Sequence, residues 1–385
     1  MNLLNEGAPC ETGDDAAGSD TRLPKKIGDL QKTITMATIA KAAGVSQGAI
    51  SSLLNDRDYG IRVSEKTRER VFKVCREMGY IPNDLRAVVR MYPELGDCCL
   101  LISTRHSAGI ADPFIARLAS AAMAEVSQAA HPLTISFYDD SVDYLDDVEK
   151  VPHPVCCGVS SKFLLYGRPN ASLFESMRRR GAPAVSLGED AACPAVLSLV
   201  PDYSRAARLA LEHLFSLGHQ RVGIISGPFG ATDFSLLELN QGVRLACDEH
   251  RVPLSALQIL HTDLTEHAGT NAVGELLARD SQISAIFCLS DAAALGVLAG
   301  ARAKGLRVPD DLSVIGCGND GCARVSDPGL TTVHLPAEEM GSLGVQQIER
   351  LVRAPLAAQP RKVILPVHLV ERSSTAPGGN SPLKS

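Results

Sequence analysis

The chain has 385 residues, more than one ordinary domain holds, and 45% of them are hydrophobic, enough for sizeable cores. Its net charge of −6 is spread unevenly: residues 22–92 contain 14 of the 38 Lys and Arg residues but 7 of the 44 Asp and Glu residues, a local charge of +7. The sequence shows no export signal and no apolar run of membrane length, which argues against a secreted or membrane-spanning protein. The absence of a CxxC motif among its 11 cysteines argues against a zinc site. These features predict a cytoplasmic protein with reduced thiols.

The first residues with a helical pattern follow a polar stretch. The polar composition of residues 1–33 predicts that they form a disordered N-terminal tail. A short helix is predicted next, because Met36, Ile39, Ala40 and Ala43 lie at i, i+3, i+4 and i+7 and form one apolar stripe. Thr35 is placed to cap this helix, and Gly44 to end it in the left-handed conformation.

A second short helix is predicted after Gly44, with Ser46 as its cap. Its inner face is apolar, and its outer face is small or polar. A helix of this kind, held by a partner helix, can enter a DNA major groove, and the local positive charge suits a polyanion. An ordinary helical hairpin is the alternative. The inner residues are Ile50, Leu53 and Leu54, and the outer ones are Gly48, Ser51, Ser52 and Asn55.

A third helix is predicted from Ser64, its cap, to Gly79, with Pro82 preventing its continuation. At this point the chain resembles the lactose/galactose repressor family, whose DNA-binding headpiece is a three-helix helix-turn-helix domain. The resemblance implies such a headpiece over residues 34–82. It rests on Thr35, Ala40, residues 43–46, Ile50, Ser51, Leu54, Asn55, residues 63–68 and residues 79–83.

The resemblance also implies which residues contact DNA. Gln47, Gly48 and Ser52 stand where the family reads bases, and the amide of Gln47 can bind an adenine edge through two hydrogen bonds. The other contacts expected in the headpiece are Thr35, Ser46, Ser51, Asn55, Thr67 and Tyr80, of which Thr35, Ser51 and Thr67 suit phosphates.

Residues 83–96 are expected to form a hinge helix and linker. In the resembled family a pair of such helices lies in the minor groove, where a leucine wedges into a base step. The corresponding residue is Val89, which is shorter and stiffer and would wedge less deeply. Asn83, Arg86 and Arg90 are the further contacts expected here. A passive linker is the alternative.

From Cys98 onward, short apolar runs alternate with amphipathic helices. The runs lack a polar alternation, as in parallel strands buried on both faces. Their alternation with helices predicts doubly wound α/β units. The expected strands are 98–103, 132–139, 162–167, 183–188, 221–227, 257–263, 285–290 and 312–318.

This region resembles the family's two-lobed core, similar to type I periplasmic binding proteins. The resemblance rests on motifs such as Asp112-Pro113-Phe114, Ser290-Asp291 and Leu312-Ser313-Val314-Ile315-Gly316. It implies a core for effector binding and dimerisation over 97–375. The expected ranges are about 98–189 and 329–354 for lobe 1, about 191–325 and 358–375 for lobe 2, and 376–385 for a flexible tail.

The effector is expected between the lobes, outside the carboxyl ends of the strands. The candidate contacts are Asp112, Phe114, Ser290, Asp291 and Asn319. For the Asp, Ser and Asn residues the alternative is a role in a turn or a helix cap.

Two family positions are altered. The arginine expected three residues before Gly242 is Leu239, and the aspartate expected after Cys317 is Gly318. Losing one charge of each sign removes a paired grip on a sugar's hydroxyl groups. The effector is therefore less polar, held in another way, or absent.

The pattern as a whole predicts a homodimeric transcriptional regulator, a repressor that binds a near-palindromic operator and responds to a small molecule such as a sugar derivative. No enzymatic activity, cofactor or metal is expected. One rival is a dinucleotide-binding oxidoreductase, because residues 316–321 spell GxGxxG, although Pro328 leaves no room for the long helix that this site requires. The other rival is a solute-binding protein without a regulatory role.

Overall fold

The computed structural model divides the chain into two compact units, Met1–Ala87 and Val88–Ser385. We describe each unit by itself. The residues that the structure describes are 35–55, 63–80, 82, 85–92, 95–106, 108–128, 131–193, 196–227, 234–353 and 362–378. The predicted tail 1–33 lies outside them.

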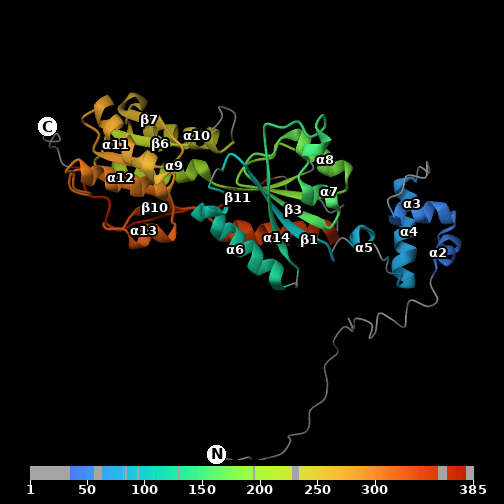
Figure 1. Ribbon diagram of the computed structural model, residues 1–385. Helices are drawn as coiled ribbons and strands as arrows, with labels where there is room; N and C mark the ends of the chain where they lie inside the picture. The colour runs from blue at the N-terminus through green and yellow to red at the C-terminus, as the bar shows by residue number, and fades with distance from the viewer. Residues whose placement is uncertain are drawn as a thin grey trace, which may run out of the picture. The chain divides into compact units, whose positions relative to one another are not determined.

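The described part of the first unit is helical (Figure 1). The three predicted caps are confirmed: the side chains of Thr35, Ser46 and Ser64 each accept a hydrogen bond from a backbone N–H three residues later, at 3.2 to 3.3 Å. Gly44 and Gly79 end their helices with φ of 63° and 70°, as predicted. The helices are α2 (Met36–Ala43), α3 (Gln47–Asn55) and α4 (Glu65–Met78).

The apolar faces of these helices meet in a small core. The predicted inner residues of α3 are all buried, and Ile39, Ala40 and Ala43 of α2 are buried with them. On α4 the buried side chains are Val71, Phe72 and Cys75. Burial raises the pKa of the Cys75 thiol to about 11, so this cysteine stays protonated in the core.

The predicted hinge helix is present as α5 (Leu85–Met91), which spans the boundary between the two units. The second unit then contains two six-stranded sheets among its described residues, each covered by helices (Figure 1). We call the first sheet with its helices lobe 1 and the second lobe 2. The predicted two-lobed α/β class is confirmed.

The lobe 1 sheet has the strand order β11-β5-β4-β3-β1-β2, with every pair parallel. Parallel strands place their carboxyl ends at one edge, where the loops that follow β1, β2, β3 and β4 gather. The strands are β1 (Asp97–Ser103), β2 (Leu133–Tyr138), β3 (Ser160–Tyr166), β4 (Ala184–Leu187), β5 (Leu197–Pro201) and β11 (Lys362–Leu365).

The lobe 2 sheet has the order β12-β10-β9-β8-β6-β7 and is parallel except for the pair of β10 and β12. Buried residues on successive positions of one strand face opposite sides, which explains the unbroken apolar runs in the sequence. The strands are β6 (Val222–Ser226), β7 (Leu257–His261), β8 (Ala285–Cys288), β9 (Ser313–Gly318), β10 (Thr331–His334) and β12 (His368–Val370).

Helices cover both faces of each sheet. In lobe 1, α6 (Pro113–Gln128) and α14 (Ala337–Arg353) pack on one face, and α7 (His153–Cys157) and α8 (Ala171–Arg179) pack on the other. In lobe 2, α9 (Tyr203–Ser216) and α10 (Phe234–His250) oppose α11 (Glu266–Arg279) and α12 (Asp291–Ala303). The remaining helices are α13 (Gly321–Val325) and the short 3₁₀ turns η2 (Gly109–Ala111), η3 (Val148–Lys150) and η4 (Leu254–Ala256).

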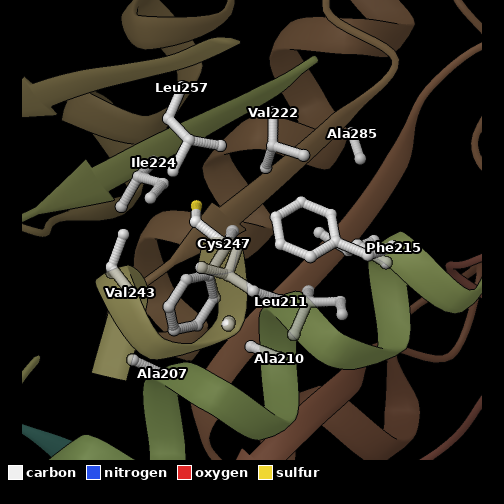
Figure 2. Packing of buried hydrophobic residues seen from close by; sticks show 14 of the residues in the cluster. Ala207, Ala210, Leu211, Phe215, Val222, Ile224, Val243, Cys247, Leu257 and Ala285 are labelled. Carbon is white, nitrogen blue, oxygen red and sulfur yellow. The ribbon is translucent and has the colours of Figure 1, made fainter. Parts of the chain in front are cut away.

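Figure 2 shows how one side of the lobe 2 core is built. Ala207, Leu211 and Phe215 of α9 meet Val243 and Cys247 of α10, and both helices face the strands. The strand side chains in this cluster include Val222, Ile224, Leu257 and Ala285. This continuous apolar packing is the main favourable term that holds the helices on the sheet.

The chain crosses between the lobes later than the sequence predicted. β5 was expected in lobe 2, but it pairs with β4 and β11 in lobe 1. β10 was expected in lobe 1, but it pairs with β9 in lobe 2. β11 was expected in lobe 2, but it pairs with β5 in lobe 1, so the last crossing lies between β11 and β12. These strands are three to five residues long, and the sheet to which such a strand adds is decided by backbone pairing, which the side-chain pattern does not encode.

None of the helices that the structure describes combines the length and the apolar character needed to cross a membrane.

Candidate nucleic-acid interface and effector site

The exposed end of α3 carries the predicted base-reading residues. Ser46, Gln47 and Gly48 are exposed, while Ser51 and Ser52 are half-buried. The opposite face packs against α2, with Ile50 fully buried and Leu54 1% exposed. The helix is therefore fixed by its apolar side and presents an amide side chain and a bare backbone at its N-terminal end, where a polar duplex edge can approach.

Two of the predicted phosphate contacts lie at the N-terminal ends of α2 and α4. Thr35 is exposed, and its Oγ1 lies 2.8 Å from Thr38 Oγ1. Thr67 Oγ1 lies 2.9 Å from the Ser64 hydroxyl. Tyr80 is half-buried, and burial raises the pKa of its phenol, so the group remains a neutral donor.

Several predicted contacts fall outside what the structure describes. Asn83 is one of them, and so are the side chains of Asn55, Arg86 and Arg90. Val89 is described, and its side chain is 6% exposed. A Cβ built on Gly96 would lie 2.9 Å from Val89 Cγ1, so the predicted wedge residue packs beside Gly96 within its own unit.

The predicted effector contacts of lobe 1 have structural partners. Asp112 Oδ1 accepts hydrogen bonds from the N–H groups of Phe114 at 2.9 Å and Ile115 at 3.2 Å, so it caps α6. The ring of Phe114 is half-buried, with its centroid 5.9 Å from that of Tyr166. Burial raises the pKa of the Tyr166 phenol far above its ordinary value.

Ser290 and Asp291 of lobe 2 are also engaged within the fold. The Ser290 hydroxyl donates to Leu264 O at 2.9 Å and accepts from Ala293 N at 3.0 Å as the cap of α12. Asp291 is fully buried, and its two carboxylate oxygens accept from Thr332 Oγ1 at 2.6 Å and from the N–H of Asp320 at 2.7 Å. Burial raises the pKa of Asp291, against the effect of these bonds.

Asn319 stands at the end of β9 with φ of 58°, a conformation that asparagine tolerates better than most residues. Its Oδ1 accepts from Arg372 Nη2 at 2.7 Å, and its Nδ2 lies 3.3 Å from His334 Nδ1. Ser290, Asp291 and Asn319 therefore all have partners inside lobe 2. Ser290 has the predicted alternative role of a helix cap, whereas Asp291 bonds to the distant residues Thr332 and Asp320 instead of capping a helix.

Arg117 of α6 is a site residue that the sequence analysis missed. Its guanidinium has five N–H donors, and all five are used. Nη1 donates to Gly318 O at 2.8 Å and to Asp320 Oδ1 at 2.7 Å. Nη2 donates to Leu335 O and Glu338 Oε2, both at 3.0 Å, and Nε donates to Glu338 Oε1 at 2.9 Å. Arg117 thus joins lobe 1 to the end of the central lobe 2 strand and to the segment that crosses back.

A signal for Arg117 was present in the sequence. Arg117 and Glu125 are the two charged residues of α6, and Arg117 lies near the N-terminus, where the helix dipole disfavours a cation. An arginine in that position needs acidic partners from elsewhere, and Asp320 and Glu338 supply them. Burial raises the pKa of Asp320 to about 6, with Asp291 acting in the same direction and Arg117 opposing it.

The two altered family positions, Leu239 and Gly318, carry an apolar side chain and no side chain, respectively. Leu239 is 7% exposed and belongs to the apolar cluster of α9, α10 and the sheet, together with Cys317. Gly318 has φ of 135°, a conformation that side chains rarely adopt. Neither position offers a charged group to a ligand.

A cavity of about 1180 Å³ runs along α8 of lobe 1, from the loops at the carboxyl edge of the sheet to the segment that precedes β4 at the amino edge. Arg105, Arg168 and Glu189, each from a loop after a strand, line it, and Phe234 and Leu237 of α10 face it from lobe 2. The part of this cavity at the carboxyl edge lies where an open α/β sheet binds its ligands. The five predicted effector contacts are not among the residues that line it.

The glycine pattern at residues 316–321 lacks the context of a dinucleotide site. The helix that follows it, α13, has five residues and ends at Val325. A pyrophosphate site of this kind needs a longer helix whose N-terminus faces the phosphates. The argument from Pro328 is therefore confirmed.

Comparisons with known proteins match both units. The family profile "Bacterial regulatory proteins, lacI family" matches residues 35–83, and "Periplasmic binding protein-like domain" matches residues 211–375. The HTH-type transcriptional regulator DegA of Bacillus subtilis (strain 168) is 31% identical over 350 residues, which cover 89% of this chain and 98% of that protein.

Two solved structures extend the similarity. The complex of the transcriptional regulator CelR with cellobiose has a TM-score of 0.63 at 25% identity, covering 89% of this chain and 99% of that one. The lac repressor dimer bound to operator and the anti-inducer ONPF has a TM-score of 0.62 at 22% identity, covering 90% and 100%. At the second identity the likeness is one of fold.

Proposed function

The chain belongs to the lacI family of bacterial regulatory proteins, and from this membership we propose that it represses transcription by binding a near-palindromic DNA operator as a homodimer, with an affinity set by a small molecule between the lobes. It acts by binding rather than by catalysis, in the bacterial cytoplasm where the operator lies. The observation that carries the proposal is the built and capped helix-turn-helix of α2 and α3, with Gln47 and Gly48 exposed at the start of α3.

The base contacts follow from the geometry of α3. Its apolar face is buried against the headpiece, so its N-terminal end is the part that can enter a major groove. Gln47 binds one adenine through its amide, Ser52 reads a second base edge, and Gly48 allows close approach. Ser51, Thr35 and Thr67 contact phosphates. The basic charge of residues 22–92 adds an attraction to DNA that weakens with salt.

A second copy of the chain is the proposed partner of the core. β2 and β7 are edge strands, and each exposes a large apolar side chain: Phe137 is 49% exposed and Ile259 is 39% exposed. Met123 of the neighbouring helix α6 is 55% exposed. Exposed apolar edges favour pairing with another chain, and a two-fold dimer would place two headpieces on two half-sites.

The proposed effector site is the part of the cavity that lies at the carboxyl edge of lobe 1. Its arginine and carboxylate side chains suit a polar small molecule, and the ring of Phe234 offers an apolar wall. A sugar is the proposed class, because the structure of CelR similar to this chain holds cellobiose. A ligand that contacts both lobes favours one lobe orientation and so changes the affinity for DNA.

Selection from a random pool of DNA duplexes by the full-length protein tests this function. We expect enrichment of one sequence made of two inverted half-sites, because two identical headpieces read the duplex. Recovery of unrelated sequences, or of a single half-site with no inverted partner, would contradict the dimeric operator.

A further inference from the structure

The polar groups of lobe 2 that were predicted to hold an effector are already bonded inside the protein. Both oxygens of Asp291 accept hydrogen bonds, from Thr332 and from the N–H of Asp320. The hydroxyl of Ser290 both donates and accepts, and Asn319 Oδ1 accepts from Arg372. Each of these groups keeps some hydrogen-bonding capacity, but the bonds that it already makes fix its orientation, and several of them involve a charged partner and are stronger than average.

Gly318 shows why this chain cannot carry an aspartate at that position. A Cβ built on Gly318 would lie 3.2 Å from Asp320 Oδ2 and 3.4 Å from Asp291 Oδ2, in a backbone conformation with φ of 135°. A carboxylate there would be strained and would stand beside two others in a buried site. The acidic group of this loop is instead Asp320, 6% exposed, which faces Arg117 of the other lobe.

Arg117 therefore bridges the lobes with bonds that the chain itself supplies. Its side chain is 18% exposed. Two of its acceptors, Gly318 O and Asp320, lie in the lobe 2 loop, and Leu335 O lies in the crossing segment, while Glu338 at the start of α14 holds the guanidinium from within lobe 1. We propose that Arg117 is an interlobe clasp, which holds lobe 1 against lobe 2 in the orientation of this structure so that this orientation does not depend on an effector alone.

The clasp has a regulatory consequence that rests on the proposed function. A small molecule can shift the lobes only by as much as its affinities for the two orientations differ. In this chain the difference in binding free energy between the two orientations must exceed the free energy needed to break the bonds of Arg117 to lobe 2. The clasp thus sets the threshold that an effector has to overcome, and Arg117 is a positioning residue rather than a ligand contact.

Hydrogen–deuterium exchange of the full-length protein without DNA tests the clasp. Arg117→Met keeps the length of the side chain and removes its donors, and Arg117→Lys keeps the charge but loses the fork. Arg179→Met is the control, because Arg179 is exposed on α8 of the same lobe and its partner Glu175 is also held by Arg178. Peptides covering residues 316–323 and 334–340 report on the lobe contact, and β3 and β8 report on folding.

We expect exchange at the lobe contact to be about tenfold faster in Arg117→Met, less accelerated in Arg117→Lys and unchanged in Arg179→Met, with β3 and β8 equally protected in all. If Arg117→Met also loses protection in β3 and β8, it is unfolding, and Arg117→Lys is compared with Arg179→Met instead. Faster exchange at the lobe contact in Arg117→Lys alone, with β3 and β8 protected in both, then supports the clasp. Equal exchange at the lobe contact in all the proteins would overturn the clasp. Because this measurement needs no DNA, it fails or succeeds independently of the proposed function, which operator binding tests.

Discussion

The buried carboxyl of Asp320 makes a sharp prediction about stability and pH. Burial raises the pKa of Asp320 from 3.8 to about 6 in the folded protein. Between these two values the folded state keeps a proton that the unfolded state has lost, so the contribution of this group to stability is fully present below pH 3.8 and is lost as the pH rises through about 6. The difference amounts to about 3 kcal/mol, of which about 2 kcal/mol falls between pH 4.5 and 7.5.

The assay is urea unfolding of the wild type and of Asp320→Asn at several pH values between 4.5 and 7.5. The asparagine cannot ionise, so the carboxylates that do not interact with Asp320 cancel in the difference between the two proteins, which then reports the titration of Asp320 coupled to Asp291. The lost contact with Arg117 adds an offset that changes little with pH. We expect the stability of the wild type relative to the variant to fall by about 2 kcal/mol as the pH rises. A flat difference, or one that rises with pH, would refute the reasoning.

Three further predictions concern the headpiece, the packing of lobe 2 and the division into units. Gln47→Ala should relax the preference at one base pair by about 1–3 kcal/mol, measured by competition among operators with single base changes; an unchanged preference at every position would argue against its placement. Gly269→Ala should destabilise the protein by about 1–3 kcal/mol, because its Cβ would overlap the carbonyl of Ala293 on α12. Gly274→Ala on the same helix is the control: its Cβ meets only the flexible end of Lys304, so this change should be neutral or stabilising. Equal thermal shifts in the two variants would contradict the close packing of α11 on α12. Deleting residues 1–87 should abolish operator binding and leave a folded dimeric core, and an unfolded or monomeric product in circular dichroism and sedimentation would contradict the division.

The headpiece could be predicted from the sequence because its signals are local. Thr35, Ser46 and Ser64 are placed to accept from the third following N–H, and Gly44 and Gly79 close their helices at positive φ. The positions of these caps and helix ends depend only on neighbouring residues in the sequence. Eight strands of the core, β1 to β4 and β6 to β9, were found for a similar reason, since each is a short apolar run between turn residues.

The features that the sequence did not reveal depend on pairing across long distances. β5, β10, β11 and β12 are short, and their sheet is chosen by the strand that accepts them rather than by their own residues. The bonds of Arg117 join residues about 200 positions apart. The roles of Asp291 and Asn319 depend on such partners too, because a side chain free to hold a ligand and one already bonded look identical in a sequence.

The central claim is that a capped cationic headpiece recognises one duplex sequence and that the bilobal core adjusts the strength of that binding. The most direct measurement compares the dissociation constants of the full-length protein for its selected operator and for a scrambled duplex of equal length, at one salt concentration. We predict a preference of about a thousandfold or more for the operator, as in specific regulators. Equal affinity for the two duplexes would contradict the account.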